Sequence, residues 1–137
     1  MKPIVLSAPA PRSLDLIFTP DKLKQLRETY EVVETTDDTM AALPTEMLRQ
    51  ARYILGQPPI SKATLALMGQ LKAVLNVESN LINNMPYPIL FKRGIHVLTT
   101  GAVFAKPVAA LGLGLALELA RGIPDADVAS RKGNDQW

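Results

Sequence analysis

The stretch Ala105–Arg121, AKPVAALGLGLALELAR, is the segment around which this chain is organised. It predicts one helix, with Pro107 accepted in the first turn and Arg121-Gly122 as the stop. Leucines fall on several faces of this helix, and they include Leu111, Leu113, Leu115 and Leu117. A helix that is apolar nearly all round is normally buried on more than one side. Other elements must therefore cover it.

The composition is that of a folded protein of one domain's size. The chain has 137 residues, 47% of them apolar and 20% charged, and a net charge of +2. Its basic residues form no cluster longer than two, so no nucleic-acid patch is expected. Cysteine is absent, which excludes disulfides, cysteine nucleophiles and thiolate metal sites. With one histidine and no suitable carboxylate spacing, no metal site is expected.

Two apolar runs could in principle serve as export or membrane signals, but both are short. Ile4-Val5-Leu6 is too short for a signal peptide. The run between Lys106 and Glu118 is shorter than the ~20 residues that a membrane span needs. The sequence therefore predicts a soluble cytoplasmic protein without a membrane partner.

Strand-like and helix-like segments alternate along the first hundred residues. Strands are expected at 2–7, 30–36, 52–56, 73–77 and 96–100. Helices are expected from Thr19-Pro20-Asp21, at 44–51, from Ser61 and at 87–92. This alternation predicts an α/β fold with right-handed βαβ units, a flavodoxin-like parallel five-stranded sheet and flanking helices. Residues 123–137 are expected to form a polar tail.

In sheets of this kind, ligands bind beyond the carboxyl ends of the strands. That rule draws attention to the loops after Leu6, Leu55, Val77 and Thr100. Two of these loops carry polar or special residues, namely Glu78-Ser79-Asn80 and Thr99-Thr100-Gly101.

Three other features are weaker candidates for a functional role. Gly112-Leu113-Gly114 begins like a dinucleotide-binding motif, but its third glycine would be Leu117 and the motif falls mid-helix, which favours close helix packing. His96 is expected to be structural. Glu78 is a candidate general base, but no second carboxylate or histidine is adjacent in sequence, which favours a solvated or hydrogen-bonded loop acid.

An ordered set of segments resembles one protein family. The segments are Leu71-Lys-Ala-Val, 77–81, Arg93-Gly-Ile-His-Val, Ala105-Lys-Pro-Val-Ala-Ala-Leu, Leu119-Ala-Arg, Arg131-Lys-Gly133 and Trp137. Together they resemble the first part of a D-isomer-specific 2-hydroxyacid dehydrogenase, a family that includes phosphoglycerate, glyoxylate and formate dehydrogenases. The resemblance covers Leu71–Trp137 well and Lys2–Gln70 in the order of elements.

The resemblance implies an enzyme built from a flavodoxin-like substrate domain with an inserted NAD domain. Residues 1–104 would form the substrate domain, 105–122 an interdomain-type helix, and 123–137 a tail that ends where the NAD domain would begin. The family's cofactor motif, substrate-binding arginine and acid-base pair come after the point that matches Trp137. We therefore expect a truncated chain with no catalytic residues, which binds neither NAD nor NADP alone.

The resemblance also implies the site and the partners. Val77, Glu78, Ser79 and Asn80 would hold a small 2-hydroxy or 2-oxo acid, and Ser79 and Thr100 would lie next to the cofactor. The partner would be the missing NAD-binding half, or a second copy associating through Ala105–Arg121.

The sequence departs from the family pattern at this loop. Glu78-Ser79-Asn80 stands where the family has a glycine-rich loop, and the charge of Glu78 would repel a substrate carboxylate unless the side chain points away. The family's usual acidic residue after Val-Ala is here Ala110, and Lys106 and the region near Pro86 also depart. The alternative hypothesis is a non-enzymatic flavodoxin-like module that docks a partner through Ala105–Arg121.

Overall fold

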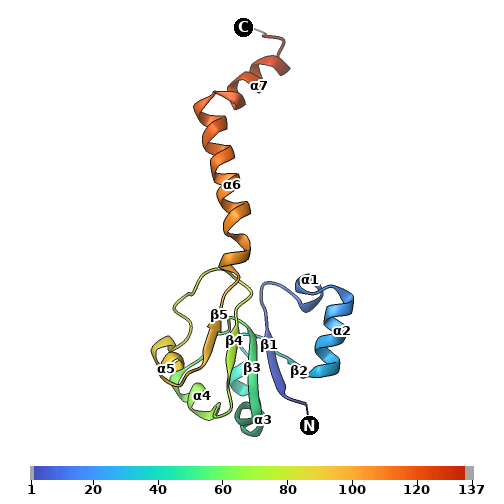
Figure 1. Ribbon diagram of the computed structural model, residues 1–137, viewed down its shortest axis with the longest axis vertical. Coiled ribbons are helices and arrows are strands. Elements are labelled where there is room, and N and C mark those ends of the chain that lie inside the picture. Colours follow the sequence, from blue (N-terminus) through green and yellow to red (C-terminus); the bar gives the residue numbers. More distant parts are fainter. Residues whose placement is uncertain (1, 135–137) are drawn as a thin grey trace. The chain divides into compact units, whose positions relative to one another are not determined.

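A computed structural model describes residues 2–134 of the chain. Residues 1 and 135–137 lie outside the described residues, and with them Trp137, at which the NAD domain was expected to begin. The chain divides into two compact units, Met1–Gly101 and Ala102–Trp137. The first unit holds a sheet with its helices, and the second holds most of a long helix and a shorter one (Figure 1).

The first unit is built on five parallel strands in the order β2-β1-β3-β4-β5. The strands are β1 (Ile4–Ala8), β2 (Glu31–Glu34), β3 (Ala51–Gly56), β4 (Ala73–Leu75) and β5 (His96–Leu98). All four pairings are parallel. The predicted flavodoxin-like α/β fold is therefore confirmed, and every strand end lies within two residues of its predicted bound.

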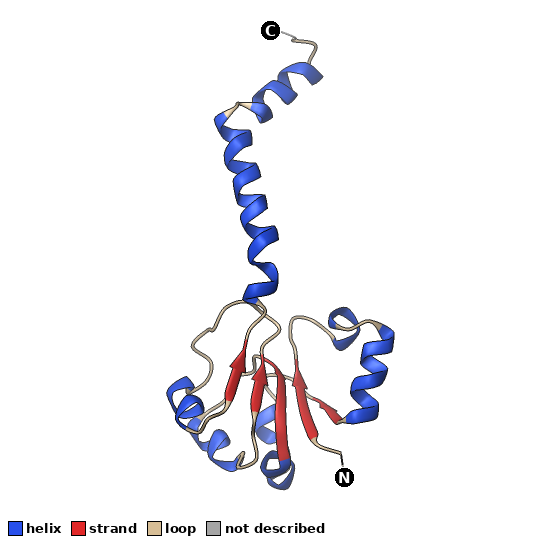
Figure 2. Ribbon diagram, viewed as in Figure 1, coloured by secondary structure: helices blue, strands red, loops and turns tan. Residues whose placement is uncertain are grey.

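Helical segments connect these strands (Figure 2). They are α1 (Leu14–Ile17), α2 (Pro20–Thr29), η1 (Met40–Ala42), α3 (Thr45–Gln50), α4 (Lys62–Leu67) and α5 (Tyr87–Lys92). Ser61 caps α4 as predicted, because its hydroxyl accepts a hydrogen bond from Thr64 N. Thr19 precedes α2 as predicted but makes no side-chain cap bond. The four-residue helix α1 was not predicted, since it is too short to show a helical period.

The two faces of the sheet are covered unequally. Ile54 and Val74 point to the first face, where Leu48 of α3, Leu65 of α4 and Leu90 of α5 complete a large buried core. We call this side the covered face. On the opposite side, a smaller core forms where Leu14 of α1 and Leu23 of α2 pack near Val5. This second side also carries Leu98, which is 52% exposed.

A glycine brings β1 and β3 close together where both strands end. Gly56 has a φ of +116°, and a Cβ built there would lie 1.9 Å from Ala8 O. Only glycine combines this backbone conformation with so close an approach. The loops that leave the carboxyl edge of the sheet therefore start from a tightly fixed position.

The long helix of the second unit, α6, spans Gly101–Ala120. It begins four residues before the predicted start, so the prediction that Pro107 lies in the first turn is wrong: Pro107 is inside the helix. Proline has no N–H, and the carbonyl four residues earlier loses its helical partner there. The sequence interpretation missed this because it treated the proline as a start signal.

None of the residues of α6 is buried. An 18-residue window of α6 has a mean hydropathy of 1.6. By length and composition alone, α6 could therefore cross a membrane. The predicted apolar run was too short because it left out the apolar residues from Ala102 to Phe104.

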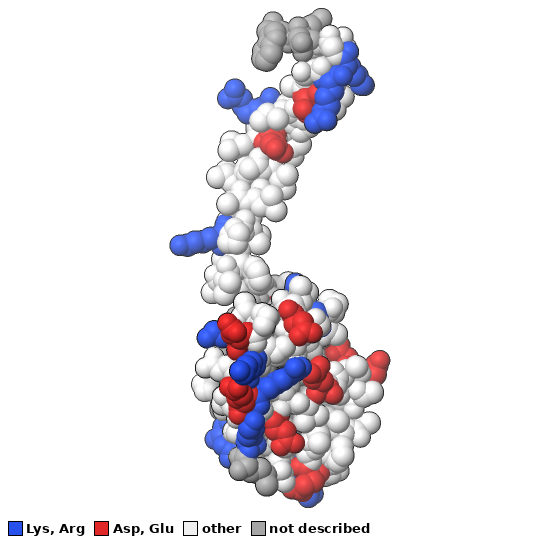
Figure 3. All heavy atoms as spheres, turned by 90° about the vertical axis from the view of Figure 1, so that its right-hand side faces the viewer, with Lys and Arg blue, Asp and Glu red and all other residues white. Residues whose placement is uncertain are grey.

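A second helix, α7 (Ile123–Arg131), occupies most of the stretch that was predicted to be a polar tail. Gly122 precedes it with a φ of +62°, and Arg131 pairs with Asp127 at 2.9 Å. In the space-filling view, charged side chains gather over α7, whereas the surface of α6 is mostly uncharged (Figure 3). The charged and polar residues of this stretch had been interpreted as a tail, so α7 was not predicted.

Candidate functional site

The predicted site lies at the carboxyl edge of the sheet, within the first unit. Loop 76–80 follows β4, and its backbone is tied to the segment after β5: Thr100 N donates to Glu78 O at 3.3 Å, and Thr100 Oγ1 lies 3.5 Å from Val77 O. Gly101 also lies beside this loop, because a Cβ built on it would be in van der Waals contact with Ser79 O, at 3.5 Å. The structure thus brings the predicted residues of both loops together.

Asn76 fixes the shape of this loop from inside. Its side chain is 5% exposed; Oδ1 accepts from Glu78 N at 2.9 Å, and Nδ2 donates to Asn80 O at 3.1 Å. From the loop after β3, Gln57 Nε2 donates to the same Asn80 oxygen at 2.8 Å. One amide side chain therefore closes the loop on itself, and a second one ties it to the neighbouring strand.

This arrangement leaves two successive backbone donors free. Among the described residues 2–134, the N–H groups of Ser79 and Asn80 have no hydrogen-bond acceptor. Both residues are exposed. Successive N–H groups in a turn form a concave site for an anion. Ser79 and Asn80 are therefore the backbone donors that this loop offers to an anion.

Glu78 does not stand as an isolated charge in this loop. Its Oε1 accepts from Arg12 Nε at 2.9 Å, and both side chains are about 40% exposed. An exposed pair of this kind contributes only about 0–1 kcal/mol to stability. Its importance here is electrostatic, because the guanidinium offsets the carboxylate that was expected to repel an anionic substrate.

Sequence reasoning missed Arg12, Gln57 and Asn76. Arg12 and Glu78 are 66 positions apart, and no local pattern links them. For Asn76 a signal did exist, since a polar side chain directly after the apolar run Ala73-Val-Leu marks a strand end at the binding edge.

The other predicted candidates lie apart from this loop. His96 begins β5 and pairs with Ala73 at the start of β4, so it lies at the amino edge of the sheet, away from Glu78. Gly112 and Gly114 are inside α6. Their backbone N–H groups belong to the helix and do not form a phosphate-binding turn.

Two more polar groups in the first unit stand out, one by its raised pKa and the other by its buried hydroxyl. Burial raises the pKa of Asp37, which follows β2, and the neighbouring charge of Asp38 raises it further. The hydroxyl of Ser7 in β1 is buried and has no hydrogen-bond partner among residues 2–134. Within that same range, no three histidine, aspartate or glutamate side chains group as a metal site.

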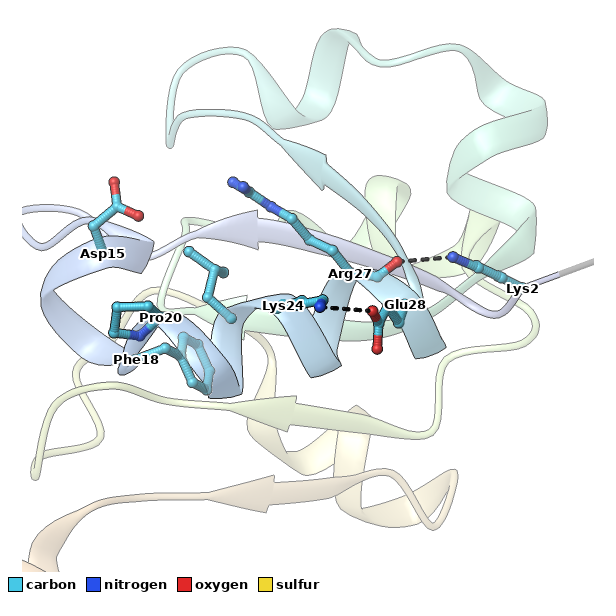
Figure 4. A pocket seen from close by; sticks show the side chains of 8 residues that line it. Lys2, Asp15, Phe18, Pro20, Lys24, Arg27 and Glu28 are labelled. Atoms are coloured by element: carbon cyan, nitrogen blue, oxygen red, sulfur yellow. Dashed lines mark hydrogen bonds and ion pairs between the residues drawn. The ribbon is translucent and has the colours of Figure 1, made fainter.

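A separate hollow runs along α2 (Figure 4). Its lining includes Phe18, Leu23 and Arg27, and Lys2 Nζ donates to Arg27 O at 2.8 Å across it. Lys24 pairs with Glu28 at 3.9 Å on the same helix. Lys2 is thus held by a backbone carbonyl and Lys24 by a carboxylate, and the lining of the hollow includes none of the residues of loop 76–80.

Solved structures with the same fold place the chain among known proteins. A phosphoglycerate oxidoreductase from Rhizobium etli is 57% identical to it, with a TM-score of 0.80, and the match covers 99% of this chain and 42% of that one. The sequence-based resemblance to the D-2-hydroxyacid dehydrogenases is confirmed. This chain corresponds to one part of such an enzyme.

Other 2-hydroxyacid dehydrogenases agree with this result. The NADPH-dependent glyoxylate/hydroxypyruvate reductase of Sinorhizobium meliloti is 26% identical, with a TM-score of 0.65, and the match covers 97% of this chain and 40% of that one. The D-mandelate dehydrogenase of Rhodotorula graminis, at 20% identity and a TM-score of 0.65, shares the fold over 98% of this chain and 42% of its own. This chain thus spans about two fifths of the length of these dehydrogenases.

Two further comparisons gave no match. No protein-family model matches the sequence, and no curated protein matches it.

Proposed function

We propose that this chain is the substrate-binding part of an NAD- or NADP-dependent D-2-hydroxyacid dehydrogenase. The observation that carries the proposal is loop 76–80, in which buried Asn76 fixes the backbone and the N–H groups of Ser79 and Asn80 remain available. The substrate is a small 2-hydroxy or 2-oxo acid, and its carboxylate accepts from these two groups. Ser79 Oγ supplies a third donor.

Charge compensation makes this loop suitable for an anion. Two carboxylates ~4 Å apart repel by about 1 kcal/mol even in bulk water. Arg12 at 2.9 Å from Glu78 opposes that repulsion. Arg12 is therefore part of the proposed site, as the residue that makes Glu78 compatible with a substrate carboxylate.

The cofactor is proposed to bind mainly to the remainder of the enzyme. A structure of the Sinorhizobium meliloti reductase contains NADP and malonate, and that enzyme is 26% identical to this chain. Ser79 and Thr100 are proposed to lie beside the cofactor, but Gly112 and Gly114 in α6 do not fit a dinucleotide pyrophosphate. We assign no hydride or proton transfer to the residues of this chain.

The first experiment titrates labelled protein with glycolate, glyoxylate and D-lactate while amide shifts are followed by NMR. Binding in the millimolar range, about −4 kcal/mol, is expected, with shifts confined to Val77–Leu81 and Thr99–Ala102. Glycolamide, which has the same size but no carboxylate, is the control ligand and should cause no shifts there. Equal shifts with glycolamide, or shifts centred elsewhere, would refute the site.

A pair of variants tests the role of the backbone. Ser79→Ala keeps the N–H group and should weaken glycolate binding only slightly. Ser79→Pro removes that N–H and should abolish the shifts. A circular dichroism spectrum like that of the parent would show that the fold is kept, and strong binding by the proline variant would contradict a backbone site.

A further expectation separates this part from the whole enzyme. The chain alone should neither bind NADH in calorimetry nor oxidise NADH above blank with glyoxylate, hydroxypyruvate or pyruvate. Calorimetric binding of NADH, or steady turnover, would show that the cofactor site lies within these residues.

A second candidate function is supported by α6. Its residues are unburied and mostly apolar, and exposed apolar surface of this extent marks association sites. We propose that α6 packs against the rest of the enzyme in the cytoplasm, or against a second copy. A native mass spectrum of the chain distinguishes a defined complex from a monomer, and sedimentation with membranes on cell fractionation would contradict the cytoplasmic location.

A further inference from the structure

A basic hollow lies at the amino edge of the sheet, which is the edge opposite to loop 76–80. Because the strands are parallel, the amino ends of β3, β4 and β5 lie together there (Figure 1). A hollow of about 390 Å³ opens at this edge, and its lining includes the cationic residues Arg52, Lys72 and Arg93. Among residues 2–134, none of those that line it is an aspartate or a glutamate. We call it the amino-edge hollow.

Two of these cations stand side by side on neighbouring strands. Lys72 N donates to Arg52 O at 2.8 Å, which places the two residues next to each other where β3 and β4 begin. Like charges at such positions destabilise a sheet. Both residues are exposed, and no ion pair within residues 2–134 includes either side chain. The described part of the chain therefore holds two like charges together without a carboxylate to offset them.

The third cation is held in place by the main chain. Arg93 Nη1 donates to Leu65 O at 2.8 Å, and Nη2 donates to Met68 O. These carbonyls belong to the C-terminal end of α4, where a cation is favourable. The guanidinium of Arg93 is thus fixed in position, and within residues 2–134 it also forms no ion pair.

Helix ends at this edge offset only part of the positive charge. The helices α4 and α5 end at Leu67 and Lys92, and a helix C-terminus carries about −0.5 elementary charge. Two such ends offset about one of the three cations, so a surplus of about two positive charges remains. Gln70 also lines the hollow, and its backbone N–H has no acceptor among residues 2–134. The hollow therefore has the charge and a spare donor for a doubly charged oxyanion.

We propose that the amino-edge hollow binds a phosphate dianion, either inorganic phosphate or the phosphate group of a small ester. A phosphate monoester carries about 1.5–2 negative charges at pH 7 and three acceptor oxygens, which match the surplus charge and the donors. The hollow is also large enough for the group that such a phosphate is attached to, since ligand sites span about 300–1,000 Å³. The site is separate from loop 76–80, so this proposal and the proposed binding of a 2-hydroxy acid can fail independently.

The test is an NMR titration of the labelled 137-residue chain at constant ionic strength, slightly above neutral pH, where phosphate is mostly doubly charged. Inorganic phosphate and glycerol 3-phosphate are the probes, and dimethyl phosphate, which carries one charge, is the control. Phosphate should shift the amide signals of Gln70, Lys72 and Gly94, and dimethyl phosphate should bind about tenfold more weakly. Equal shifts from glycerol 3-phosphate would assign the site to esters, and their absence would assign it to the free ion. Equal affinity for dimethyl phosphate, or shifts confined to Ser79 and Asn80, would overturn the proposal.

Matched variants separate a defined site from the general positive charge of the chain. Lys72→Gln and Lys62→Gln each remove one charge, but Lys62 is exposed at the start of α4 and does not line the hollow. Lys72→Gln should weaken phosphate binding by about fivefold or more, and Lys62→Gln by less than about twofold. Equal weakening by the two variants would overturn the proposal. If circular dichroism shows that Lys72→Gln disturbs the fold, Arg52→Gln gives the same comparison.

Discussion

Two residues that are neighbours in sequence, Ile54 and Leu55, belong to opposite faces of the same sheet. On the covered face, the row of Ile54, Val74 and Val97 packs under α3, α4 and α5. On the other side, the row of Leu55, Leu75 and Leu98 runs from buried to half-exposed. The strands are apolar on both sides, and only the helices differ. Strand composition therefore shows that a face needs a cover, and it does not show whether this chain supplies that cover.

The largest expected effect comes from the covered face. Ile54→Ala removes a side chain that is 0% exposed and leaves a cavity among packed helices. The free energy of unfolding should fall by about 2–5 kcal/mol, measured by urea denaturation followed by circular dichroism. A loss below about 1 kcal/mol would mean that the two faces do not differ as the structure indicates.

The other row should give a graded series. Alanine at Leu55, which is 8% exposed, should cost about 2–3 kcal/mol, and Leu75→Ala should cost less. Leu98→Ala, at 52% exposure, should change the free energy of unfolding by about 0.5 kcal/mol or less. The same urea titration measures all three. Equal losses across the row would show that Leu98 is as well covered in solution as Leu55.

A small change of opposite sign in the free energy of unfolding is expected at Ser7, which pairs with Leu55 in the sheet. Ser7 lies in β1 next to Leu6, and its buried hydroxyl has no partner among the described residues. Ser7→Ala should therefore leave the free energy of unfolding unchanged or raise it by up to about 1 kcal/mol. The matched control is Ser61→Ala, which loses the cap bond to Thr64 N and should cost about 1 kcal/mol. A loss at Ser7 as large as that at Ser61 would reveal a partner for its hydroxyl.

The sheet could be predicted from sequence because each strand is a short apolar run bounded by turn residues. Segments such as Tyr87–Lys92 also carry clear limits, since Pro86 precedes this helix and Gly94 follows it with a φ of +71°. The second unit was predicted less well. Pro107 suggested a start where the helix only passes through, and the charged residues after Gly122 suggested a tail where α7 forms.

The site could be predicted only in part. The carboxyl-edge rule located residues 77–80 and Thr100, because strand order determines which loops meet. The contacts that shape the loop could not be derived in the same way. Arg12 reaches Glu78 from the loop after β1, and Gln57 reaches Asn80 from the loop after β3. Such pairings depend on how side chains pack in three dimensions, and a single sequence does not record them.

Gly56 has a practical consequence for anyone who redesigns this edge. Every other amino acid carries a Cβ, which would fall 1.9 Å from Ala8 O, a backbone atom that cannot turn aside like a flexible side chain. If position 56 is randomised in a library, a selection for folded protein should retain glycine there. Diversity intended to change substrate preference therefore belongs in the loops beyond this residue, where the backbone can adjust.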